Sequence, residues 1–101
     1  MISSNVSSIQ AHQTLMNNNA NNVANTNTDG FVPTNGTVSE SAGNAVTANL
    51  SEATDTGSAQ SQSDLSKELT DQIVIEDVVD ANAAAIKTQD QMFGTLLDIK
   101  A

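Results

Sequence analysis

The first residues whose types and spacing could do chemistry form the run Asn25-Thr26-Asn27-Thr28-Asp29-Gly30. Oxygen-bearing side chains at alternate positions, followed by Gly at the sixth, match the first half of an EF-hand calcium loop. Such a loop also needs a bidentate Glu at its twelfth position, where this chain has Gly36. We therefore interpret the run as a turn and expect no metal site.

Three carboxylates, Glu76, Asp77 and Asp80, form a second group that could act in acid–base chemistry or metal binding. Glu76 and Asp80 are four residues apart, so they share one face of a helix, where like charges repel. We interpret the group as an acidic stripe on a helix face that is turned to solvent or to the lumen of an assembly. His12 has no Cys or second His at helical spacing, and we expect it on a helix surface. The sequence thus predicts no enzyme, no catalytic residue and no cofactor.

Composition narrows the remaining classes of function. The chain has 101 residues and a formal net charge of −9, with no Cys. A protein this acidic lacks the cationic surface that neutralises phosphates, so we expect no nucleic acid partner. No apolar run approaches the roughly 18 residues that span a bilayer, so we expect no direct membrane insertion and no cleaved signal. The question becomes what the chain assembles with.

Residues 1–28 predict an N-terminal helix that needs a partner. Their apolar residues follow steps of four and three, broken only at Gln13, and lie at Ile2, Val6, Ile9, Met16, Ala20 and Val23. That spacing is typical of a heptad seam, although Asn and Ser are weak helix formers. The Asn-rich run at 17–22 has two interpretations: a prion-like segment, or amides that bond across helix interfaces and cap carbonyls. Asp29-Gly30 then predicts a turn.

Residues 29–63 predict a polar middle segment with little structure of its own. The segment consists mainly of Ser, Thr, Asn, Gly and Ala with scattered acids. Such a composition cannot offset the entropy of ordering, so we expect a disordered or extended chain unless another subunit orders it. A short strand around Thr37–Val38 or Val46–Thr47 remains open.

Residues 64–101 predict a C-terminal helix from Leu65 to Lys100, with Ser63 or Asp64 as its N-cap. Apolar residues form two seams along this helix rather than one. A solitary two-helix hairpin needs only one stripe facing its partner, so two seams indicate several neighbours. The first seam contains Leu69, Val79, Ala83, Ile86, Phe93 and Leu97, and the second contains Ile75, Val78, Ala85, Met92, Leu96 and Ile99.

Two motifs at opposite ends of the chain resemble those of a known family. The run Ala20-Asn21-Asn22-Val23-Ala24-Asn25-Thr26-Asn27-Thr28-Asp29-Gly30-Phe31 is similar to the N-terminal signature of bacterial flagellar axial proteins, the rod and hook family. Near the other end, Asp80-Ala81-Asn82 resembles the family's Glu-Ala-Asn, and Ile86-Lys87-Thr88 resembles its aliphatic-Lys-Thr. Met92 with Thr95-Leu96-Leu97 resembles Met-x-x-Thr-Leu-Leu. The residues that carry the motif include Ala20, Asn21, Asn22, Val23, Ala24, Asn25, Thr28, Gly30, Phe31, Ala81 and Asn82.

The resemblance implies a mainly α fold, in which two long terminal helices form an antiparallel coiled-coil-like hairpin. In that family such helices stack in a tube around the export channel, and subunits pass through the flagellar type III export apparatus without a cleaved signal. The short polar middle, unlike the β-rich outer domains of hook members, favours a minimal rod-type subunit. Val79 stands where the family usually has an aromatic residue, and the basic residue nearby is missing.

We therefore expect a structural subunit of the basal-body rod that polymerises with itself and with other axial subunits. The predicted packing residues are Ile9, Met16, Val23, Val79, Ile86, Met92, Phe93, Leu96 and Leu97. Two alternatives stay open: an acidic, partly disordered export adaptor or regulator, and a diverged paralogue that no longer polymerises.

Overall fold

Two helices of unequal length make up most of the molecule, and a computed structural model describes residues 2–40 and 45–100. The element order is α1 (Ile2–Ala24), β1 (Thr34–Glu40), β2 (Val46–Glu52) and α2 (Leu65–Lys100). The radius of gyration is 18.1 Å and the extents are 67 × 25 × 13 Å. A compact domain of this length would have a radius of gyration of about 13 Å, so the molecule is elongated.

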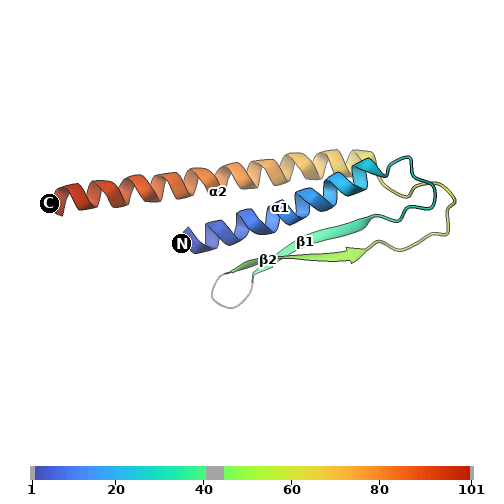
Figure 1. Cartoon of the computed structure of the whole chain (residues 1–101), viewed down its shortest axis with the longest axis horizontal. Helices are drawn as coiled ribbons and strands as arrows, with labels where there is room; N and C mark the ends of the chain where they lie inside the picture. The colour runs from blue at the N-terminus through green and yellow to red at the C-terminus, as the bar shows by residue number, and fades with distance from the viewer. Residues whose placement is uncertain (1, 41–44, 101) are drawn as a thin grey trace.

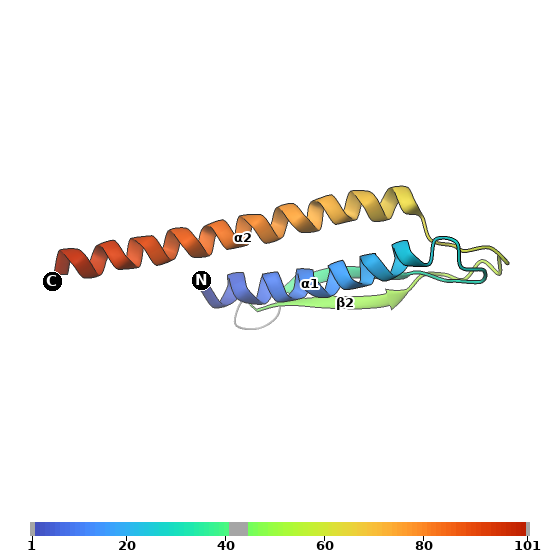
Figure 2. The same cartoon turned by 45° about the horizontal axis from the view of Figure 1, so that its top comes forward.

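The helices lie side by side and run in opposite directions (Figures 1 and 2). Asn19 near the end of α1 bonds Glu68 at the start of α2, whereas Ser8 near the start of α1 bonds Asn82 further along α2. The C-terminal part of α2 continues past the N-terminus of α1 in both views. The predicted antiparallel helix pair is therefore present, with a long unpaired end on α2.

The predicted helix bounds are confirmed closely at α2 and less closely at α1. The α2 helix begins at Leu65, and Asp64 caps it by accepting the Lys67 N–H at 3.2 Å. A side-chain acceptor at this position satisfies one of the free amides of the first turn. The α1 helix ends at Ala24 rather than near residue 28. The chain turns there, since the Thr26 N–H donates to the Val23 carbonyl and the Thr28 N–H donates to the Asn25 carbonyl.

The prediction of a disordered middle segment is wrong. β1 and β2 form an antiparallel two-stranded sheet in which Thr34 pairs with Glu52 and Glu40 with Val46. The hairpin packs across α1, on the side away from α2 (Figure 1). A two-stranded hairpin is marginal alone, and the helix beneath it supplies the missing support. The two places where the sequence allowed a short strand, Thr37–Val38 and Val46–Thr47, lie within β1 and β2.

Very few large apolar side chains are buried. Among the described residues, the buried apolar side chains of the helices are Ala11 and Ile75, whereas Ser8, His12, Asn19, Asn22 and Glu68 are also buried. Most of the fully buried side chains of the two helices are therefore polar. Within the described part of the chain, neither helix is long and apolar enough to cross a membrane.

Candidate functional site

A buried carboxylate and two buried amides join the helices at the β-hairpin end of the molecule. The Asn19 side chain donates to the backbone carbonyl of Glu68 at 2.6 Å and to its Oε2 at 2.8 Å. The Asn22 side chain donates to the other carboxylate oxygen, Oε1, at 3.0 Å. Glu68 is only 3% exposed, and Asn22 is 1% exposed. Amide donors thus supply the hydrogen bonds that a buried carboxylate requires.

The same amides hold the first residue of β1. Asn22 donates to the Thr34 carbonyl at 2.9 Å and accepts the Thr34 N–H at 3.2 Å through its own Oδ1. Asn18 donates to the same carbonyl at 2.6 Å. Three elements, α1, β1 and α2, therefore meet at Asn22. We name Asn18, Asn19, Asn22, Thr34 and Glu68 the amide cluster.

The sequence predicted part of this cluster. Of the two interpretations of the Asn-rich run, the structure supports amides that bond across helix interfaces and to carbonyls. Sequence reasoning missed Glu68 and Thr34, because their part in the cluster depends on how distant elements meet. The four-residue spacing of Asn18 and Asn22 on one helix face was the available signal.

The remaining residues of the N-terminal motif form the end of α1 and its turn. Asn25 donates to the backbone carbonyl of Asn21 at 2.8 Å, and the Thr28 hydroxyl donates to the Asn25 side-chain oxygen at 3.0 Å. Gly30 has a φ of 73°, the left-handed region that Gly adopts without strain. Its N–H donates to the Ala59 carbonyl at 2.9 Å. The predicted turn is confirmed.

Two serines of the middle segment complete the end of α1. The Ser61 hydroxyl donates to the Asn25 carbonyl at 2.7 Å, and the Ser63 hydroxyl donates to the Asn22 carbonyl at 2.9 Å. The last carbonyls of a helix have no partner within the helix, so these bonds satisfy them. The polar middle segment is thus ordered partly by capping α1.

A second polar contact joins the helices further along and contains the motif residue Asn82. Its side chain donates to the Ser8 hydroxyl at 3.0 Å and to the Val78 carbonyl of its own helix at 2.9 Å. His12 lies beside Ser8, with Nδ1 2.7 Å from the Ser8 carbonyl oxygen. A carbonyl only accepts, so Nδ1 carries the proton here.

The expectation of a surface position for His12 is wrong, because its side chain is 7% exposed. The α2 helix covers it, and a single sequence does not show which helix face a partner will cover. Glu76, Asp77 and Asp80 are exposed, in keeping with the predicted solvated stripe. No group of three or more His, Cys, Asp or Glu that could hold a metal ion lies within residues 2–40 and 45–100.

The predicted packing residues divide into two sets. The first set is half-buried and lies where the two helices run side by side: Ile9, Met16, Val23, Val79 and Ile86. The other set lies on the end of α2 that extends past α1 and is largely exposed: Met92 at 67%, Phe93 at 63%, Leu96 at 61% and Leu97 at 54%. With Ile99, at 78%, this second set forms what we name the α2 end.

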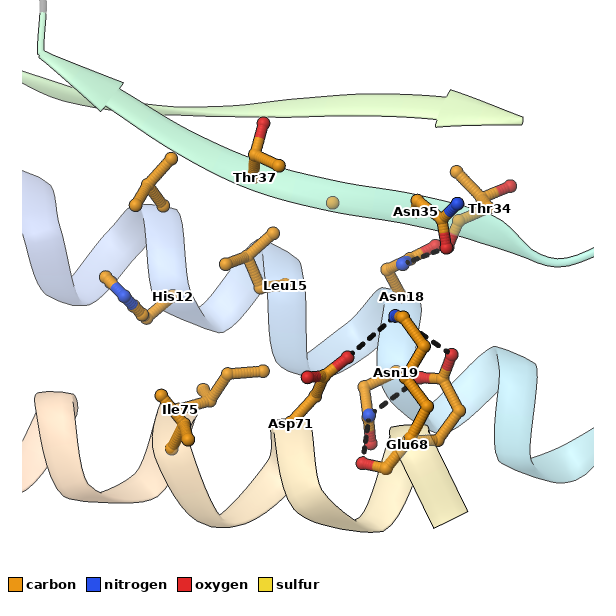
Figure 3. Close-up of a pocket in the computed structure, with 14 residues that line it drawn as sticks. His12, Leu15, Asn18, Asn19, Thr34, Asn35, Thr37, Glu68, Asp71 and Ile75 are labelled. Carbon is orange, nitrogen blue, oxygen red and sulfur yellow. Dashed lines mark hydrogen bonds and ion pairs between the residues drawn. The ribbon is translucent and has the colours of Figure 1, made fainter. Parts of the chain in front are cut away.

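A groove of about 490 Å³ lies beside the amide cluster (Figure 3). One wall is β1 from Thr34 to Val38, the other is α2, and α1 contributes His12, Leu15 and Asn18. Asn18, Asn19 and Glu68 gather at one end of the groove, whereas His12 and Ile75 lie toward the other. On the α2 wall, Lys67 bonds Asp71 at 2.9 Å, and this bond raises the pKa of the lysine.

No protein-family model and no curated protein matches this chain. The fold and the site define a class by architecture alone. It is an elongated, antiparallel helix pair that buried side-chain amides hold together, with a β-hairpin across one helix and an exposed apolar end on the other.

Proposed function

We propose that the chain is a structural subunit of the bacterial flagellar basal-body rod, which polymerises with itself and with other axial subunits through its terminal helices. The proposal for this cellular system rests on the two motifs that resemble the axial family. The observation that carries assembly is the α2 end, where large apolar side chains are exposed beyond the reach of α1. Contiguous exposed apolar surface usually marks an interaction site.

The motif residues Asn22 and Asn82 support this proposal, because each bonds the opposite helix. One residue of each signature thus joins the subunit's own two helices, and the apolar residues at the end of the second signature stay available to neighbours. On this view the pair is a coiled-coil-like unit of the rod wall. The subunit would leave the cytoplasm through the flagellar type III export apparatus and reside in the basal body.

A change on the α2 end tests this function. Phe93→Glu places a charge on a surface that would be buried in the assembly, where an unpaired charge is strongly unfavourable. We expect loss of motility and at least a tenfold loss of the protein from purified basal bodies. Gln91→Glu adds the same charge at an exposed polar position nearby and should leave both unchanged.

Circular dichroism of both variants separates assembly from folding, because Phe93 makes no contact that the helix pair needs. A motile Phe93→Glu strain with normal incorporation would contradict the role of the α2 end. Equal losses of motility and incorporation in both variants would show that the added charge, rather than its place on the α2 end, causes the effect.

The sparse apolar core favours a second candidate, an acidic export adaptor or regulator that folds on one partner. Ala11 and Ile75 are the buried apolar side chains of the described helices, which is little for a chain of this length. Copy number discriminates the two candidates, because a rod subunit is present in several copies per flagellum and an adaptor is not retained there.

A further inference from the structure

The outer edge of β1 borders the groove beside the amide cluster. Of the sheet, only β1 contributes residues to the groove lining, and α2 forms the opposite wall. In Figure 3, β1 lies between β2 and α2 around Thr34 and Thr37, so there the edge that does not pair with β2 is turned toward α2; nearer the tip of the β1 arrow the two strands cross in this view. An edge strand presents backbone N–H and C=O groups that another strand can pair with.

Three hydrogen bonds fix which backbone groups point outward. The Thr34 N–H donates to Asn22 outside the sheet, and the Val46 N–H donates to the Ser7 hydroxyl outside the sheet. Ala53, by contrast, donates to Pro33 across the hairpin. Outward and inward groups alternate along an antiparallel strand. The backbone groups of Gly36 and Val38 therefore point outward from the β1 edge, as those of Thr34 do.

The first outward position of this edge is already paired with an amide. Asn22 both accepts from Thr34 N–H and donates to Thr34 C=O, which is the two-point pairing that a neighbouring strand would make. A side-chain carboxamide has the same donor and acceptor as a peptide group. Within residues 2–40 and 45–100, the structure gives no partner outside the hairpin for the backbone groups of Gly36 and Val38.

We propose that the β1 edge binds an extended segment of another protein, which adds a third strand to the sheet and lies in the groove between β1 and α2. The pairing would begin next to the contact between Asn22 and Thr34 and run from Gly36 to Val38, about 10 Å at 3.4 Å per residue. The inference does not depend on the flagellar function.

The shape of the groove selects a single strand. The strand next to β1 would lie about 4.8 Å from it, and α2 closes the far side. A β-strand of a second copy would bring its own hairpin partner and its α1 helix, so it would need more room beside β1 than a single strand does. The occupant is therefore an isolated extended segment, such as a flexible terminus or linker, rather than the sheet edge of another copy.

Charge and burial define the chemistry of this segment. On the groove wall, Asp71 is already paired with Lys67. Glu40 lies at the far end of β1, and the chain as a whole has a net charge of −9. A neutral or basic segment is favoured over an acidic one. Every second residue of the segment would face Leu15 and Ile75 on the groove lining, so those positions suit aliphatic side chains.

Amide hydrogen exchange on the full chain, followed by NMR, tests the proposal with the peptide acetyl-Lys-Val-Thr-Val-Thr-Val-Lys-amide as the probe. In the free chain, the amides of Gly36 and Val38 should exchange at least tenfold faster than that of Thr34. The peptide should slow both of them at least tenfold and leave Ala48 on the opposite edge unchanged. A peptide with Glu in place of both Lys should bind at least fivefold more weakly.

Two proline variants provide matched controls. Val38→Pro removes one outward N–H from the β1 edge, and Ala48→Pro removes the outward N–H of its cross-strand partner from the β2 edge. Proline is tolerated on edge strands where the N–H faces outward. We expect Val38→Pro to weaken peptide binding at least tenfold and Ala48→Pro to change it less than twofold.

Three results would overturn the proposal. One is that no exchange protection appears at Gly36 and Val38 at millimolar peptide. Another is that both proline variants weaken binding equally, or that neither does. The third is that these amides become protected as the concentration of the protein alone rises, because the occupant would then be a second copy.

Discussion

The two ends of the helix pair are built in opposite ways. Near the β-hairpin, the amide cluster buries polar groups and gives the Glu68 carboxylate and the Thr34 backbone hydrogen-bond partners from α1. The α2 end, on the far side, carries large apolar side chains with Met92, Phe93 and Leu96 each more than 60% exposed. The polar end joins α1, α2 and β1, and the apolar end is left exposed.

The comparison explains how a chain with so little apolar burial can hold one arrangement. Buried polar contacts add little net stability, but leaving one of their members unpaired is unfavourable. The amide cluster therefore selects one register between the helices and one position for β1. The large apolar side chains of the α2 end, which would normally help to build a core, stay exposed instead.

The largest expected effect comes from breaking the amide cluster at its centre. Asn22→Ala leaves Glu68 Oε1 and the Thr34 N–H without this partner in a buried site. We expect the free energy of unfolding to fall by about 2–4 kcal/mol, measured by urea denaturation. Asn17→Ala, at an exposed position of the same helix, should change it by less than about 0.5 kcal/mol.

A similar midpoint for both variants would contradict the claim that the cluster holds the fold. Asn22→Asp is a sharper comparison, because it keeps the side-chain shape but places a second carboxylate beside Glu68. It should be at least as destabilising as Asn22→Ala at pH 7, because it also removes the amide donor and places two like charges in a buried site.

Two glycines should respond to the same substitution with opposite signs. A Cβ at Gly36 would collide with the end of the Leu15 side chain and lie 3.0 Å from Leu50 Cδ2, so both side-chain ends must shift and Gly36→Ala should destabilise by at most about 1 kcal/mol. A Cβ at Gly94, within α2, meets nothing within 4 Å. Gly94→Ala should therefore stabilise by about 0.5–1 kcal/mol, because Ala is the better helix former.

Thermal denaturation of the two glycine variants checks this contrast. Equal shifts of Tm would mean that β1 does not pack on α1 as closely as Leu15 and Gly36 indicate.

The smallest expected effect concerns the ion pair on the groove wall. The hydrogen bond from Lys67 to Asp71 raises the pKa of the lysine above 10.5. The pair therefore stabilises the fold below that pH, and the contribution is lost as pH rises through the folded-state pKa. Half of the lysine side chain is exposed, so we expect only about 0.3 kcal/mol.

Urea midpoints of the wild type and Lys67→Met should differ slightly at pH 8 and converge above pH 11. The chain has no Tyr or Cys that titrates in this range. A gap that persists at high pH would assign the effect to packing of the lysine stem.

The sequence predicted the elements that depend on local signals. Leu65–Lys100 was identified by its cap, its apolar spacing and the lack of Pro, and the turn at Gly30 by Asp-Gly. The hairpin was not predicted, because residues 34–52 are too polar to order alone and depend on α1 beneath Gly36. The burial of His12 and Glu68 was missed for the same reason, since each is covered by a distant element.

The central claim is that the chain is a structural subunit whose exposed α2 end is covered by its neighbours in an assembly. Quantitative mass spectrometry of detergent-purified hook–basal bodies from the organism that encodes the chain tests it most directly. The account predicts stable recovery at several copies per particle, comparable with known rod subunits. Absence from the particles, with the protein in the cytosol or the medium, would contradict it and favour the adaptor or the diverged paralogue.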